Sequence, residues 1–313
     1  MYRKLLAGLI LLSFLPIYGY IYPGVVPMEK FNYLYFAESG VVPKHLHPKV
    51  GIYYWNFSGS EYFNNNGHRE DYNQKYSESW VVPMFAFGTG DAVEFGVCFP
   101  VLSEKYEDNS GFFKYTADAS GLGDITLWTK AIVTRDPNFG LRVAAKLATG
   151  DDAPGEDKLP TGTGQTDIDM GFVLSHYPEK MGFACDVAVG FRLRMSKEVD
   201  TLTVFKVGDR WYMYNSGTYD PGDEGRLQLY LGGMPMEGFG ILFGGDGFVS
   251  LNDRWEGDEI RKSYRASAAI GMKAFFETKF GLRLDGGFKF DVAGKDYPAG
   301  FGLMLGATFV PQY

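Results

Sequence analysis

The sequence lacks the signatures of several large classes of protein. Beyond its amino-terminal segment, no run of about 18 apolar residues occurs, which excludes a transmembrane helix. Asp and Glu (38) outnumber Lys and Arg (30), and the resulting net charge of −8 argues against a nucleic-acid partner. Only two cysteines are present, Cys98 and Cys185, and alternation along their segments puts them on opposite faces. We therefore expect two free thiols.

The first 19 residues predict a signal peptide. Arg3 and Lys4 precede an apolar run over 5–15 that is too short to span a bilayer, and Gly19 offers a small residue before the cleavage point. We therefore expect an exported protein. In a membrane, a chain without spanning helices must form a closed barrel. Residues 20–48 contain four prolines and predict an irregular segment, either a periplasmic lead-in or a plug within a lumen.

Aromatic residues (17%) and glycines (41) are abundant, a balance typical of β proteins. Residues 280–291 alternate strictly between apolar and charged or small side chains, which predicts a strand with two unlike faces. The apolar face would pack on a second sheet in a soluble sandwich. In an outer-membrane barrel it would contact lipid, and the charged face would line a wet lumen.

Twelve segments follow this pattern, most of them ten residues or longer. Soluble strands average about 5–6 residues, whereas a tilted bilayer crossing takes about ten. Pro83 and Pro100 fall inside two of the segments and predict a bulge or irregular end there. The predicted strands are 49–58, 78–88, 92–101, 122–135, 139–150, 166–176, 181–195, 225–233, 238–250, 261–275, 279–291 and 299–310.

The connections alternate between short and long. This order is typical of an even-numbered barrel with short periplasmic turns and long outer loops. We therefore predict an all-β fold, a single transmembrane up-and-down antiparallel barrel of about twelve strands over 49–313. The loop 196–224 contains two apolar runs around Gly208-Asp209 and predicts an extra hairpin. The other long loops are 59–77, 102–121, 151–165, 251–260 and 292–298, and the short ones are 88–91, 135–140, 177–182, 234–238 and 276–279.

Several motifs resemble a known family. The segments GTGDAVEFGVCFPV (88–101), SGLGDITLWTKAIV (120–133) and KLPTGTG (158–164) are similar to the meta-pathway phenol-degradation type of outer-membrane protein. Members of that family are predicted transporters related to fatty-acid and aromatic-hydrocarbon channels. The resemblance covers roughly 78–196 and implies an outer-membrane barrel that passes small hydrophobic or aromatic molecules. The final Tyr313, in step with Phe309, resembles the aromatic carboxy-terminal strand that outer-membrane barrels present to their assembly machinery.

The inward face of the predicted barrel carries charges of both signs. They either line a narrow pore and set its field, or pair across strands and fill the lumen. Barrels of eight strands are filled and those of sixteen or more leave a channel, so twelve strands leave both readings open. The predicted pore-lining residues are Lys130, Arg142, Lys146, Asp169, Asp186, Arg192, Arg194, Arg283, Asp285 and Lys289, and the same face carries Arg265, Lys273 and Asp291.

No catalytic or cofactor site is predicted. Gly162-Thr163-Gly164 lacks the Lys of a phosphate-binding loop and precedes a strand. Ser175 and His176 are adjacent and point to opposite faces, unlike the paired Ser and His of a hydrolase. His45 and His47, and the acidic run over 151–157, read as solvated loops rather than metal sites.

Three functions fit the sequence. The first is a passive outer-membrane channel for small molecules. The second is a closed structural or surface-interaction barrel, and the third is a soluble periplasmic ligand-binding β protein. The expected partners are outer-membrane lipid, the barrel assembly machinery and a small-molecule solute, with no nucleic acid and no cofactor. Membrane fractionation separates the third function from the others, and conductance separates the first two.

Overall fold

The computed structural model describes residues 43, 47–71, 73–90, 92–109, 114–152, 158–178, 180–199, 203–207, 210–214 and 216–311. The predicted signal peptide and most of the segment 20–48 lie outside these residues, as do His45, Glu156, Asp157 and Tyr313. No described residue belongs to a helix long and apolar enough to cross a membrane.

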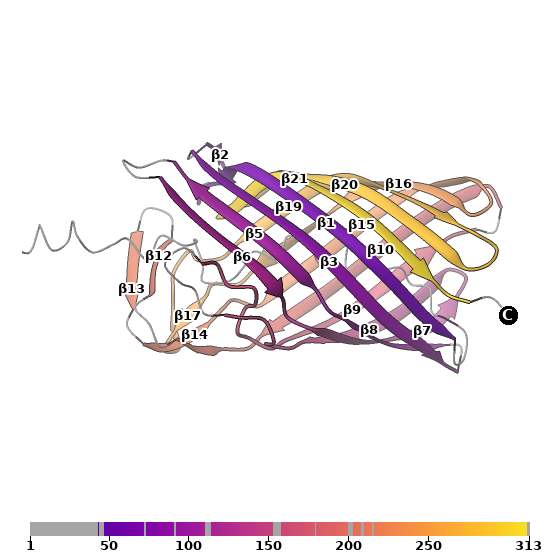
Figure 1. The fold of residues 1–313 in the computed structure, drawn as a ribbon, viewed down its shortest axis with the longest axis horizontal. Coiled ribbons are helices and arrows are strands. Elements are labelled where there is room, and N and C mark those ends of the chain that lie inside the picture. The colour runs from indigo at the N-terminus through magenta and orange to yellow at the C-terminus, as the bar shows by residue number, and fades with distance from the viewer. Residues whose placement is uncertain are drawn as a thin grey trace, which may run out of the picture.

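The chain forms a closed barrel of twelve antiparallel strands, as the alternating pattern predicts (Figure 1). Closure is made by β1, whose Trp55 is the register partner of Trp80 on β3 and of Met304 on β21. The wall strands are β1 (Pro48–Phe63), β3 (Gln74–Thr89), β4 (Val93–Cys98) continued by β5 (Val101–Asp108), β6 (Tyr115–Leu122) continued by β7 (Thr126–Arg135), β8 (Asn138–Lys146), β9 (Asp167–His176), β10 (Gly182–Arg194), β15 (Glu224–Met236), β16 (Phe239–Ser250), β19 (Ala266–Glu277), β20 (Leu282–Lys295) and β21 (Tyr297–Phe309).

Side chains divide between the two faces of this wall. On β9, Phe172 is 53% exposed while its neighbour Val173 is 4% exposed. On β20, Leu284 is 47% exposed, whereas the side chain of Asp285 retains 8% of its accessible area. The outer surface is therefore a band of apolar side chains, and the polar groups and a separate aromatic cluster lie inside. Both cysteines are free, as predicted.

Two prolines interrupt the wall at one place. β4 ends at Cys98 and β5 begins at Val101, leaving Pro100 between them, and the break lies beside Pro83 of β3. The Phe99 amide donates a hydrogen bond to the Pro83 carbonyl (3.0 Å) across the break. The irregularities predicted at Pro83 and Pro100 are therefore one interruption in the pairing of β3 with β4 and β5. It occurs there because a proline nitrogen has no hydrogen to donate.

Two predicted loops are wrong. Most of 102–121 is strand, because β5 and β6 pair with each other and extend the wall. Residues 292–298 are also strand on both sides of a one-residue turn at Asp296, which has a φ of +47°. The barrel is therefore taller than the apolar band on these strands.

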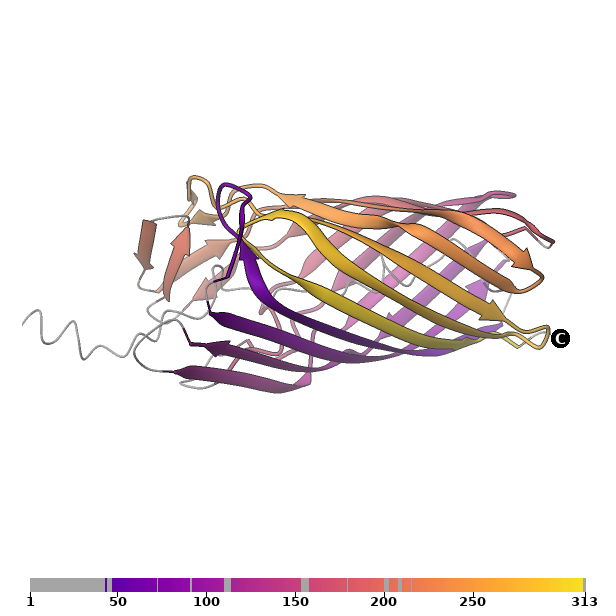
Figure 2. The ribbon, with the colours of Figure 1, turned by 90° about the horizontal axis from the view of Figure 1, so that it is seen from above.

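The remaining long connections carry small elements at the outer mouth (Figures 1 and 2). The predicted hairpin in 196–224 is confirmed as β12 (Thr203–Val207) paired with β13 (Arg210–Tyr214). It lies beyond the end of the barrel wall in both views. The other elements there are β2 (Arg69–Glu70), β11 (Lys197–Val199), β14 (Gly217–Asp220), β17 (Arg254–Trp255) and β18 (Asp258–Glu259).

Candidate functional site

One side of the barrel interior is aromatic. Tyr53, Trp55 and Phe57 point inward from β1, Trp80 from β3 and Trp128 from β7, and each is at most 7% exposed. Sequence reasoning missed this surface because β1 and β3 are apolar on both faces. The signal was present in the inward positions of β1, where aromatic residues alternate with the outward Val50, Ile52 and Tyr54.

Two of these indoles bind buried carboxylates. Trp55 Nε1 donates to Glu78 (2.9 Å), which also accepts the hydroxyl of Tyr76 (2.7 Å). Trp128 Nε1 donates to Glu94 (2.9 Å). A buried charge without hydrogen-bond partners is costly. These carboxylates therefore hold the indole N–H groups that they accept from, which fixes the positions of the rings.

Glu94 is the centre of an ionic cluster near the short-turn end. Its side chain is fully buried, with Lys130 Nζ at 3.3 Å and Lys49 Nζ at 3.4 Å. Lys130 on β7 is the register partner of Arg142 on β8, which is 1% exposed. These predicted residues therefore lie together on one part of the inner wall.

Ion pairs gather on the opposite side of the interior, where Tyr230 and Phe275 are also buried, and we call it the ionic side. Arg192 binds Asp169 (2.9 Å) on the neighbouring strand. Asp186 on β10 accepts Lys273 Nζ (2.6 Å) from β19, a contact that bypasses the two intervening strands. Asp186 also accepts the hydroxyl of Ser175 (2.7 Å). Ser175 is fully buried, whereas its neighbour His176 contacts Asp136 at the turn (3.1 Å).

Ion pairs continue to both ends of the barrel. At the outer end, Arg194 binds Glu224 (3.0 Å). On β20, Arg283 binds Asp285 (2.9 Å) and lies over the ring of Phe275 (4.1 Å to the centroid). Lys289 binds Asp246 (2.8 Å) and lies 5.4 Å from the Trp55 ring centroid, so it joins the ionic and aromatic sides.

All ten predicted pore-lining side chains thus lie inside the described wall, and they take part in an extensive set of ion pairs there. Whether they line an open pore stays a prediction. The pairs are Lys130–Glu94, Lys146–Asp167, Asp169–Arg192, Asp186–Lys273, Arg194–Glu224, Arg283–Asp285 and Lys289–Asp246.

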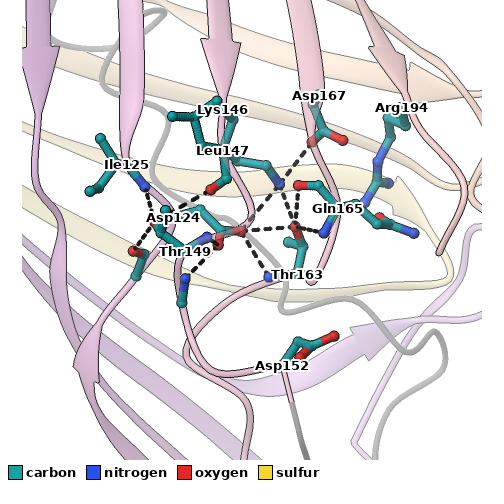
Figure 3. Close-up of polar contacts among 12 residues, drawn as sticks. Asp124, Ile125, Lys146, Leu147, Thr149, Asp152, Thr163, Gln165, Asp167 and Arg194 are labelled. Atoms are coloured by element: carbon teal, nitrogen blue, oxygen red, sulfur yellow. Dashed lines mark hydrogen bonds and ion pairs between the residues drawn. The ribbon is translucent and has the colours of Figure 1, made fainter. Parts of the chain in front are cut away.

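A second polar cluster lies toward the long-loop end of the wall (Figure 3). It joins the sequence motifs at 120–133 and 158–164. Asp124, in the short break between β6 and β7, accepts hydrogen bonds from the Thr163 amide and hydroxyl (both 2.8 Å). It also accepts the amides of Thr149 (3.1 Å) and Gly150 (3.0 Å). Lys146 Nζ donates to the Thr163 hydroxyl (2.8 Å) and binds Asp167 (2.8 Å). One carboxylate therefore holds a loop that begins 23 residues later and lies on the inner side of the wall.

Burial shifts the pKa of several groups in the elements beyond the wall, Lys197 and Asp296 among them. Desolvation lowers the pKa of the Lys197 ammonium, which donates to the Thr163 carbonyl (2.9 Å). At the β20–β21 turn, desolvation raises the pKa of Asp296 to about 6, and Lys295 and Arg265 offset part of this rise. Among the residues that the structure describes, no group of His, Cys, Asp and Glu is arranged to hold a metal ion.

Comparisons with known proteins agree with this architecture. Residues 56–306 match the family described as the putative MetA-pathway of phenol degradation. The fold is similar to the COG4313 outer membrane channel from Pseudomonas putida F1, with 16% identity, a TM-score of 0.67 and coverage of 85% of this chain and 96% of that one. The translocator domain of the autotransporter NalP from Neisseria meningitidis is also similar, with 13% identity, a TM-score of 0.51 and coverage of 84% and 88%. No curated protein sequence matches the chain significantly.

Proposed function

Because this chain belongs to the family described as the putative MetA-pathway of phenol degradation, we propose that it is a passive channel of the bacterial outer membrane for small molecules, including apolar or aromatic ones. The observation that carries the proposal is a closed wall, apolar outside, whose interior is aromatic on one side and ionic on the other. Its partners are outer-membrane lipid, the barrel assembly machinery and a small solute. The similar Pseudomonas putida protein is described as an outer membrane channel, which is in line with the proposal.

The two sides of the interior suit this role for different reasons. Trp55, Trp80 and Trp128 make one inner face apolar, and the indoles of Trp55 and Trp128 are held in place by Glu78 and Glu94. The ionic side holds charges of both signs, which sets a local field without favouring one sign of solute. The ten predicted pore-lining residues contribute to this field, as part of the proposal.

The ion pairing favours a second candidate, a closed structural or surface-interaction barrel. The predicted residues are joined to groups of opposite sign across the wall strands, as expected of side chains that fill a lumen. In that case the outer elements, including the β12–β13 hairpin, would be the functional surface. The soluble alternative is disfavoured, because soluble monomers rarely expose an apolar band of this extent.

Liposome swelling tests the channel proposal. Liposomes with the purified protein are placed in a small sugar or in benzenesulfonate, an aromatic anion that does not cross lipid unaided. The proposal predicts faster swelling than in protein-free liposomes. Trp80→Leu should lower the rate for benzenesulfonate relative to the sugar, whereas Phe85→Leu, on the lipid-facing side of the same strand, should leave the ratio unchanged. Swelling no faster than in protein-free liposomes, for both solutes, would exclude a channel and favour the closed barrel.

A further inference from the structure

The wall has a segment that is not closed by a strand ladder. β6 pairs with β5 along one edge. Along its other edge the described residues contribute an isolated parallel bridge, Asp118 to Lys158. The next wall strand in that direction, β8, ends at Lys146, and β9 begins at Asp167. Part of the connecting loop, residues 158–165, covers this edge of β6 from the inner side of the wall, and we refer to it as the strap.

The strap packs against the inner side of the wall. Leu159 is fully buried within the core cluster that includes Ala117 and Ala119 of β6, and its amide donates to the Asp118 carbonyl (2.9 Å). The hydroxyl of Thr161 donates to the Leu122 carbonyl (2.9 Å). Both contacts tie the strap to β6, but they are far fewer than the bonds of a full ladder.

At the Thr163 end of the strap, the carboxylate that accepts its hydrogen bonds is Asp124 (Figure 3). Its Oδ2 receives both donors of Thr163 and its Oδ1 receives the amides of Thr149 and Gly150. Gly162 has no room for a side chain here, because a Cβ would lie 2.6 Å from Gly150 Cα and 2.6 Å from Asp124 Oδ1. Asp124 is therefore the centre of this fastening. Lys146 and Lys197 add donors to Thr163 (2.8 and 2.9 Å), and the Asp151 carbonyl accepts the amides of Thr161 and Gly162.

The exterior at this height is polar. Along β4 and β5 the outward residues are apolar as far as Val101, and then change to Ser103 and Lys105. On β6 the outward residues above Leu122, the register partner of Val101, are Ser120 and Asp118. The strap bridge at Asp118 therefore lies above the apolar band and faces water rather than lipid.

We propose that the strap closes a water-facing side port in the upper barrel wall, and that Asp124 is the latch that keeps it closed. Release of Thr163 and Gly150 from Asp124 would weaken the hold on the strap and make it easier for the strap to swing away from β6, which opens the interior to the outer medium. The inference rests on the channel function proposed above, for which the port would be an outer entrance.

A labelling experiment tests the latch without any transport. In a Cys98→Ala, Cys185→Ala background, Leu159→Cys places a thiol at a fully buried strap position. A membrane-impermeant maleimide labels this thiol only when the strap opens. Asp124→Asn should raise the labelling rate about tenfold or more, because charge-assisted hydrogen bonds are lost and local opening becomes easier. Thr163→Val should also raise it. Asp118→Asn, which changes an exposed side chain of β6 and keeps the backbone carbonyl that accepts from Leu159, should not.

A disulfide tests the port itself. Asp118→Cys with Lys158→Cys joins the two bridge partners, so the oxidised protein should swell liposomes more slowly than the reduced one, and Asp124→Asn should swell them faster. Equal labelling of Asp124→Asn and Asp118→Asn would overturn the latch. Faster labelling with unchanged swelling, in a protein that conducts, would overturn the port. A protein that conducts in no form refutes the channel, and the labelling rates still decide the latch.

Discussion

The indole of Trp55 on β1 lies against the backbone of Gly302 on β21, and a Cβ on Gly302 would come within 2.0 Å of a ring carbon. The same relationship joins Tyr53 to Gly306 (2.3 Å) and Trp128 to Gly96 (2.1 Å). Inward glycines on neighbouring strands thus make room for the large rings of the aromatic side. The aromatic surface is a packed arrangement of rings and backbone.

Gly302→Ala should therefore destabilise the barrel. The methyl group forces the Trp55 ring off its position, and overpacking of this kind costs about 1–3 kcal/mol. Unfolding by urea in detergent, followed by tryptophan fluorescence, measures the change. Gly286→Ala is the matched control, because its Cβ would meet no atom nearer than 3.8 Å. Equal stability of the two variants would show that the ring position does not depend on Gly302.

Glu94→Gln should have a larger effect. The substitution leaves Lys49 and Lys130 inside the wall without their shared carboxylate, and a buried ion pair broken on one side costs about 3–5 kcal/mol. The free energy of unfolding in detergent measures the loss. Glu107→Gln, whose partner Lys105 is half exposed at the outer face, is the control and should change little. A loss as small for Glu94 as for Glu107 would contradict the proposed role of the cluster.

Asp296 should make stability depend on pH. Its pKa of about 6 in the folded protein exceeds the ordinary value of 3.8, so the folded state binds the proton more tightly than the unfolded state. Stability from this group is complete below pH 3.8 and is lost as pH rises to about 6. Asp296→Asn keeps a residue that tolerates positive φ and removes the charge. The variant should be more stable than the wild type at pH 8 and equal to it at pH 4, in urea unfolding at each pH. A constant difference at both pH values would contradict this assignment.

Alternation predicted the fold because lipid and lumen impose opposite demands on successive residues of a strand. Alternation did not identify the parts of strands that extend beyond the lipid. Outward Ser103, Lys105 and Asp118 are polar on β5 and β6, so these strands read as loop. The β20–β21 turn was missed because a single residue, Asp296, makes it.

The sequence predicted the ionic side of the candidate site but not the aromatic side. Charged inward residues stand out against an apolar strand, so the ionic side could be read directly. The aromatic side could not, because a tryptophan facing inward and one facing lipid have the same local pattern. The contact between Asp124 and Thr163 was also invisible, since no periodicity links two loops 39 residues apart.

The channel proposal depends most on which successive residues of a strand face lipid and which face the interior. Spin labels at Phe172→Cys and Val173→Cys on β9, in the cysteine-free background and in liposomes, measure this through their accessibility to oxygen, which concentrates in lipid. A membrane-spanning barrel predicts high oxygen accessibility at 172 and low accessibility at 173. Equal values, or a reversed order, would contradict a membrane-spanning barrel and with it the channel.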